Sequence, residues 1–324
     1  MAGRHRPPRA GAGRLRLEGA RGRAAAALRR GRDRRGRRRP RPGARHLPRA
    51  ARSEPRAEDD RLLRRLDAAH PRPPPARLQP RGDRVTTLLI GVLAPDVLDS
   101  NGDAANARVL AARAGWAGLD ARVLALREEA DFSERPDVLV AGTGADEDLP
   151  AVLDLLRAVG DTVHGWVRDE TEVVAVGAGW ELLAESFATP QAVVAGIGVL
   201  PGRAVTAERS TDDLVVESSA GVLVGFENHA RRFDGIDPAH VLSRVLHGTG
   251  DGGGVEGYAA GSLLGTHLHG PVLAKNPVLA DAILHRVAER RGLLYSTRDE
   301  RIRAADETAR AAREVIAKRL GVGR

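Results

Sequence analysis

Residues 172–183 have the pattern of a catalytic turn, but the side chain that would do the chemistry is missing. A β-branched, strand-like run ends at Val176, and small residues follow before a helix-like segment begins. This order is typical of a nucleophile elbow, the sharp strand-to-helix turn that exposes one side chain above a sheet. Small flanking residues suit such a turn because its backbone leaves little room for Cβ atoms. The apex is Gly177, so the sequence predicts an elbow without a nucleophile.

The segments before this turn alternate between strand-like and helix-like patterns. Buried-type strands separated by amphipathic helices predict an α/β fold, a doubly wound, largely parallel sheet flanked by helices. Ligands bind such sheets at the carboxyl ends of the strands, so residues 142–144 and 177–179 are expected in one cleft. The expected strands are 86–93, 121–126, 137–141 and 172–176, and the expected helices are 104–116, 147–159 and a helix from 179.

The second half of the chain has shorter strand-like segments, which favour antiparallel pairing. The glycine-rich run 248–254 lacks the lysine and hydroxyl residue that complete a phosphate-binding loop, and we interpret it as a flexible connection. The expected strands are 213–217, 222–225 and 262–268, and the expected helices are 239–246, 277–290 and 301–320.

The basic charge of the chain is concentrated at its start. Residues 1–83 hold 26 arginines and no lysine against eight acidic residues, whereas the remainder is net acidic. Without isoleucine or aromatic residues this segment cannot bury enough apolar surface to offset chain entropy, so 1–84 is predicted to be a disordered leader. We interpret it as upstream sequence from a misassigned start, with Val85 as the true first residue. A solvated tail and a nucleic-acid-binding arm are the alternatives.

Several classes of site are disfavoured by composition. The chain has no cysteine, which excludes disulfides, zinc–thiolate sites and a cysteine nucleophile. His267 and His269 are two residues apart on an expected strand and would point to opposite faces, so no metal site is predicted. Long apolar runs and a secretory h-region are lacking, so we predict a cytoplasmic protein without a membrane span.

Four short motifs, in this order, resemble one family. They are residues 99–106 (DSNGDAAN), 225–229 (GFENH), 265–271 (GTHLHGP) and 275–277 (KNP). Through them the chain from residue 85 to its last helix resembles the class I, CobB/CobQ-like glutamine amidotransferases. It is most similar to the GatD subunits of lipid II isoglutaminyl synthase, which pair with the Mur-ligase-like MurT.

The resemblance implies a specific reaction. A cysteine thiolate attacks the side-chain amide of glutamine, a histidine passes a proton to the departing ammonia, and water hydrolyses the thioester. Ammonia would then reach a MurT-like ligase, which would amidate the D-glutamate of the lipid II stem. No cofactor is implied for this chain, because ATP and Mg²⁺ are expected on the ligase.

The family's site residues carry over only in part. His269 matches the catalytic histidine, and Arg209 matches a substrate-binding arginine whose guanidinium can pair with the α-carboxylate of glutamine. The family shows Cys-Gly-Gly-Tyr-Gln at the elbow, where this chain has Gly-Ala-Gly-Trp-Glu from Gly177 to Glu181. Ala178 would supply an oxyanion N–H.

The cleft loop is also only partly kept. The family's Gly-Gly-Gly-Gln-Asp corresponds to residues 142–146 here (GTGAD), which keeps Gly142 and Gly144. We interpret Glu181 as a solvated helix residue, with a general base as the alternative, and His229 as a buried structural residue. The sequence assigns no third member of the catalytic triad.

These observations predict a GatD-like subunit, spanning 85–324, that has lost glutaminase activity and forms a heterodimer with a MurT-like ligase. Lipid II would be reached through that ligase, and no specific nucleic acid is expected. Two alternatives stay open. One is a non-catalytic scaffold that binds glutamine or a ligase, and the other is a relative of the cobyrinate-type amidotransferases.

Overall fold

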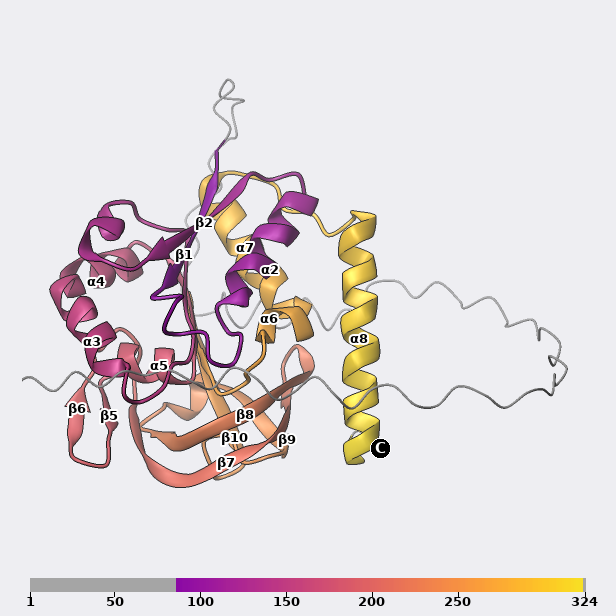
Figure 1. Cartoon of the computed structure of the whole chain (residues 1–324). Coiled ribbons are helices and arrows are strands. Elements are labelled where there is room, and N and C mark those ends of the chain that lie inside the picture. Colours follow the sequence, from indigo (N-terminus) through magenta and orange to yellow (C-terminus); the bar gives the residue numbers. More distant parts are fainter. Residues whose placement is uncertain (1–85, 323–324) are drawn as a thin grey trace, which may run out of the picture. The chain divides into compact units, whose positions relative to one another are not determined.

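The computed structural model describes residues 86–322, so the predictions for the basic leader and for Val85 lie outside the described residues. Within this range eleven strands form one sheet (Figure 1). Its strand order is β2-β1-β3-β4-β11-β10-β9-β7-β5-β6, and β8 pairs with β7 alone. The predicted α/β fold, with a largely parallel sheet flanked by helices, is confirmed.

Five neighbouring strands of this sheet are parallel and carry the core. Every residue of β1, β3 and β4 is buried, as expected for continuous apolar runs covered on both faces. Alternate residues serve opposite faces, so Val173 packs with one hydrophobic cluster and Val174 with the other. The strands are β1 (Leu88–Leu93), β2 (Ala121–Leu126), β3 (Val138–Ala141), β4 (Glu172–Val176) and β11 (Leu263–Thr266).

Helices cover the two faces separately. One face packs against α3 (Leu149–Ala158), α4 (Gly160–Arg168) and α5 (Ala178–Leu183). The other face packs against α2 (Ala105–Trp116), α6 (Val272–Lys275) and α7 (Pro277–Arg291), on the opposite side in Figure 1. The predicted helices 104–116, 147–159 and 277–290 are confirmed within two residues at each end, whereas α4 was not predicted.

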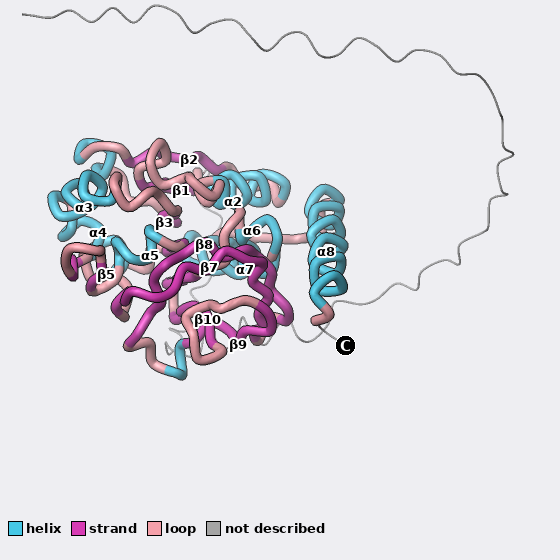
Figure 2. The backbone as a smooth tube through the Cα atoms, turned by 60° about the horizontal axis from the view of Figure 1, so that its bottom comes forward, coloured by secondary structure: helices cyan, strands magenta, loops and turns pink. Residues whose placement is uncertain are grey.

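The last helix, α8 (Glu300–Leu320), confirms the prediction for 301–320 and stands beside α6 (Figure 2). Only Ile302 and Ala309 of its residues are buried, so most of its surface is open to solvent. No helix among residues 86–322 is both long and apolar enough to cross a membrane.

The other half of the sheet is mainly antiparallel, as expected. Its longest pairing joins β7 (Arg203–Ser218) to β8 (Gly221–Asp234) through a tight turn. The predicted helix at 239–246 is wrong, because this segment forms β9 (Val241–His247) between β7 and β10 (Val255–Ala260). Hydrogen bonding to a strand on each side, β7 and β10, outweighs the local helical pattern of this segment. The remaining strands, β5 (Ser186–Ala188) and β6 (Val193–Ala195), were not predicted.

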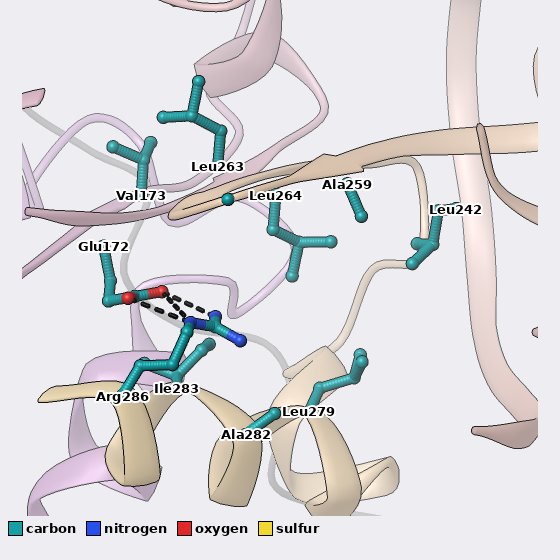
Figure 3. A pocket seen from close by; sticks show the side chains of 11 residues that line it. Glu172, Val173, Leu242, Ala259, Leu263, Leu264, Leu279, Ala282, Ile283 and Arg286 are labelled. Carbon is teal, nitrogen blue, oxygen red and sulfur yellow. Dashed lines mark hydrogen bonds and ion pairs between the residues drawn. The ribbon is translucent and has the colours of Figure 1, made fainter. Parts of the chain in front are cut away.

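A buried ion pair anchors the start of β4. Glu172 is 1% exposed and pairs with Arg286 at 2.6 Å and Arg290 at 2.7 Å, both from α7. Figure 3 shows Glu172 and Arg286 bordering a cavity of about 20 Å³ between sheet and helix, enough for a single water molecule. The strand whose opposite end carries the elbow is therefore fixed to the helix layer.

Candidate active site

The backbone of a nucleophile elbow is present at the end of β4. Gly177 has φ 53° and ψ −118°, a conformation that a residue with a side chain adopts only at a cost. Its N–H donates to Thr266 of β11 at 3.0 Å, and its carbonyl accepts from Trp180 and Glu181 at the start of α5. The strand and the helix therefore fix the turn from both sides.

Close packing explains the small residues beside the apex. A Cβ at Gly179 would lie 2.7 Å from the carbonyl oxygen of Gly142, and one at Gly265 would lie 2.5 Å from the Trp180 ring. Trp180 is fully buried and stacks on Phe233, with ring centroids 3.5 Å apart. Neither glycine can be enlarged unless its neighbours move.

A histidine–carboxylate pair faces the apex. His269 is fully buried, and its Nδ1 lies 2.9 Å from Oδ2 of Asp103, whose Oδ1 accepts from the N–H of Gly270 at 3.1 Å. The carboxylate favours the tautomer with the proton on Nδ1 and leaves Nε2 as a base. This Nε2 has no hydrogen-bond partner within residues 86–322, and it lies 3.2 Å from the Cβ that a side chain at 177 would have.

Asp103 fills the place of the third triad member, which sequence reasoning did not assign. It belongs to the 99–106 motif that carried the resemblance. The sequence therefore contained the residue in a recognised motif but did not show that it pairs with His269. Asn106 of the same motif accepts from the N–H of Leu273 in α6 at 2.9 Å. The motif thus orients His269 and joins the loop to α6.

Thr143 occupies the remaining side of the apex. Its Oγ1 donates to the carbonyl of Val176 at 3.0 Å and accepts from the N–H of Ala178 at 3.2 Å. The same Oγ1 lies well inside contact distance of the position a Cβ at Gly177 would take. The N–H that sequence reasoning assigned to an oxyanion is therefore bound to a side chain of the protein.

The sequence of this domain matches a known family. A model of the CobB/CobQ-like glutamine amidotransferase domain matches residues 92–277, more than half of the chain. The chain belongs to this family. The matched range contains the elbow, Thr143, the Asp103–His269 pair and Arg209.

Two curated relatives of this amidotransferase domain share one name, lipid II isoglutaminyl synthase (glutamine-hydrolyzing) subunit GatD. The one from Staphylococcus aureus is 28% identical over 210 residues, which cover 63% of this chain and 86% of the relative. The one from Streptococcus pneumoniae is 26% identical over 201 residues, which cover 60% and 77%. A glutamine amidotransferase structure from Thermotoga maritima is 15% identical over 74% of this chain and 96% of its own, with a TM-score of 0.39.

Glu181 of the amidotransferase domain is not the solvated residue predicted from its sequence. It is 2% exposed and pairs with Arg231 of β8 at 2.8 Å. Arg231 also binds Asp146 of the cleft loop at 2.5 Å, which lowers the pKa of that carboxyl below its usual value. A buried arginine thus connects α5 to the cleft loop, a contact that only the partner strand could have revealed.

Arg209 is an exposed residue of β7 and is linked through side chains to the loop that contains Asp103, here called the triad loop (residues 99–106). It donates to Oδ1 of Asn228 at 2.6 Å, and Nδ2 of Asn228 donates to Asn101 at 3.3 Å. Asn101 precedes Asp103 by two residues. The charge of Arg209 also contributes to the lowered pKa of Asp146. The structure therefore brings Arg209 to the rim shared by the triad loop and the cleft loop.

The glycine-rich run 248–254 is pinned by buried carboxylates. The N–H groups of Thr249 and Gly250 donate to Glu227 at 2.7 and 2.9 Å, so donors that could cradle a phosphate bind a carboxylate. Burial raises the pKa of Glu227, but His229, these N–H groups and Ser210 outweigh it and bring the pKa to about 2. The flexible connection expected from sequence is thus held in place.

His229 is buried, as expected, and lies against the loop that positions His269. Its ring stacks on His267 with centroids 4.0 Å apart, and its Nδ1 lies 2.7 Å from the carbonyl of Arg231. Burial lowers the pKa of His267. No group of three or more His, Asp or Glu side chains suited to a metal ion occurs in residues 86–322.

Glu256 holds the segment before His269 through hydrogen bonds to Thr266 and His267. One of its oxygens accepts from Oγ1 of Thr266 and from the N–H of His267, both at 2.7 Å. Burial, reinforced by nearby Asp251, raises its pKa well above the usual value. Two buried carboxylates therefore hold this segment: Glu256 binds residues 266 and 267, and Asp103 binds His269.

Proposed function

We propose that this amidotransferase domain is a GatD-type subunit that binds a MurT-like Mur ligase in the cytoplasm and has lost the glutaminase reaction. The observation that carries the proposal is Gly177 at the apex of a turn with the backbone of a nucleophile elbow, facing the His269–Asp103 pair. The chain contains no cysteine at all, so no other thiol can take over the attack on glutamine. The two curated relatives, both named as subunits of one synthase, support the assignment to a two-protein enzyme.

Each remaining site residue has a definite part in this proposal. His269 keeps a base at Nε2 but has no thiol to deprotonate, and Asp103 fixes its tautomer. Arg209 would hold the α-carboxylate of glutamine at the rim, because a guanidinium pairs with a carboxylate bidentately. Gly142 and Gly144 let the cleft loop pack closely against residues 97–104, because a Cβ at either position would meet the backbone of Leu98 or Val97. ATP, Mg²⁺ and lipid II belong to the ligase.

A second candidate is glutamine binding without turnover and without a ligase. It is favoured by the exposure of Arg209 to solvent. Under this reading the domain senses glutamine, and its affinity for glutamine falls when Arg209 is replaced by alanine.

Co-expression with the MurT-like ligase of the same genome tests the proposal. We expect the two proteins to co-elute in size-exclusion chromatography at micromolar concentration, as an interface of roughly 1,600 Å² would allow. The complex should amidate lipid II with ammonium but not with glutamine, because no thiol is present to release ammonia. Separate elution would reject the subunit assignment, and turnover with glutamine would reject the loss of glutaminase activity.

A further inference from the structure

The exchange at the elbow involves two residues from different loops. The family resemblance places cysteine at the elbow apex and glycine at the second position of the cleft loop, whereas this chain has Gly177 and Thr143. One position has lost its side chain and the other has gained one. The two positions face each other, because a Cβ on Gly177 would meet Oγ1 of Thr143.

The space that a nucleophile would need is closed on two sides. A Cβ at 177 would meet Thr143 Oγ1 on one side and Cε1 of His269, at 2.6 Å, on the other. Neither neighbour yields readily. His269 is fixed by Asp103, while Thr143 is β-branched, which restricts its χ1, and is held by hydrogen bonds to Val176 and Ala178.

The hydrogen bonds of Thr143 also occupy the groups that catalysis would use. The N–H of Ala178 is aimed at Oγ1 rather than at an open oxyanion position. The hydroxyl proton goes to the carbonyl of Val176 and not to Nε2 of His269, which has no partner in the described chain. This geometry fits a residue that fills the site and does not fit an activated nucleophile.

We propose that Thr143 is a plug that stands in for the missing nucleophile and closes the amide-binding position at the elbow. The plug rests on the proposed function only in taking this cleft as a former glutaminase site. If Thr143 is a plug, activity depends on both positions. A thiol restored at 177 stays inactive until the side chain at 143 is removed.

The absence of cysteine makes the test clean, because Gly177→Cys introduces the sole thiol of the full-length chain. The probe is 6-diazo-5-oxo-L-norleucine, a glutamine analogue that alkylates amidotransferase thiols, and the added mass is followed by mass spectrometry. The variants are Gly177→Cys, Gly177→Cys with Thr143→Gly, and Gly177→Cys with Thr143→Ser. The last is the matched control, because serine keeps Oγ1.

We expect the Thr143→Gly double variant to be labelled at least about tenfold faster than Gly177→Cys alone, because removing the side chain at 143 relieves overpacking at the thiol. This ratio corresponds to about 1.4 kcal/mol in the activation free energy. The Thr143→Ser double variant should stay as slow as Gly177→Cys alone. Equal labelling rates in all three would overturn the plug. Glutamine hydrolysis by the unmodified chain that disappears in Thr143→Gly would overturn it in favour of a threonine nucleophile.

A second measurement covers the case in which Gly177→Cys does not fold. In the Thr143→Gly single variant the N–H of Ala178 loses its acceptor, so its hydrogen exchange should accelerate, whereas Thr143→Ser should exchange like the unmodified chain. Unchanged exchange in Thr143→Gly would contradict the plug. Neither readout needs the ligase, so failure to form the heterodimer would reject the proposed function without touching this inference.

Discussion

The two halves of the site are held in place by different forces. The half that carries His269 rests on buried carboxylates, with Asp103 beneath the imidazole and Glu256 beneath the loop that leads to it. The half that carries Gly177 rests on close packing, with Gly179 against the cleft loop and Gly265 against the ring of Trp180. Side-chain carboxylates fix the base, whereas close packing and backbone hydrogen bonds fix the elbow.

The difference explains how the turn forms with glycine at its apex. The elbow is set by backbone contacts to β3, β11 and α5, none of which involves the side chain at 177. The base half depends directly on its polar side chains, since removing one partner leaves another buried and unsatisfied. The following predictions test this contrast.

The largest effect is expected from the packed half. Trp180→Ala should lower the free energy of unfolding by about 3–5 kcal/mol, because it removes a fully buried ring stacked on Phe233. Gly265→Ala should cost about 1–3 kcal/mol in the unmodified chain but far less in the Trp180→Ala background, where the clashing ring is gone. Urea denaturation measures both, and additive costs would show that the two residues do not support each other.

Removing the carboxylate beneath His269 should have a smaller effect. Asp103→Ala leaves Nδ1 of His269 and the N–H of Gly270 without acceptors, and we expect a total cost of about 1–3 kcal/mol. Asp103→Asn should cost less, because one amide oxygen can still accept from Gly270. Urea denaturation gives the costs. Nitrogen NMR should show His269 losing its preference for the Nδ1–H tautomer, and an unchanged spectrum would refute the assigned role of Asp103.

The carboxylate-supported half should also respond to pH. Because the folded pKa of Glu256 is raised above 4.5, the folded protein loses stability as the pH rises from about 4.5 through that pKa. Glu256→Gln lacks this loss, so its melting temperature relative to the unmodified chain should improve from pH 4 to pH 8. Thermal unfolding across this range checks the sign.

Glu227 is the control for Glu256, because it is also buried but its pKa is shifted in the opposite direction. Its pKa of about 2 lies below the usual 4.5, so its contribution is present above pH 4.5 and is lost as the pH falls towards 2. Glu227→Gln should therefore destabilise the domain at neutral pH and progressively less in acid. If the stabilities of Glu256→Gln and Glu227→Gln, each relative to the unmodified chain, changed with pH in the same direction, the opposite pKa shifts assigned to the two residues would be wrong.

The smallest effect is expected at the plug. Thr143→Ala removes hydrogen bonds to Val176 and Ala178, each worth about 0.5–1.5 kcal/mol net, and water can take over part of their role. The cost should be the same at pH 5 and pH 8, because no titrating group binds this hydroxyl. A pH-dependent cost, measured by urea denaturation at both values, would mean that Thr143 interacts with the proton on His269.

The sequence predicted those parts of the fold and site that depend on local pattern. Continuous apolar runs identified β1 and β4, and Pro277 marked the start of α7. Gly177 was identified from the strand-to-helix pattern around it, and His269 because its motif resembles a family. The segment 239–246 was mispredicted because its state is decided by strands on both sides rather than by its own residues.

Contacts distant in the sequence could not be predicted in this way. Asp103 and His269 are 166 residues apart, and no spacing rule joins them. Glu181 was interpreted as solvated because its partner Arg231 lies on β8, outside any local window. Thr143 looked like an imperfect copy of a glycine loop, and only the three-dimensional structure shows that its hydroxyl lies where a side chain at 177 would reach.

The left-handed backbone at Gly177 has a consequence for engineering this turn. Any residue with a side chain carries about 1–3 kcal/mol of strain at such a position, and its Cβ would also meet the hydroxyl of Thr143. A single substitution at 177 therefore meets both the strain and the clash, and a tolerated side chain at this position calls for a second change in the neighbouring loop.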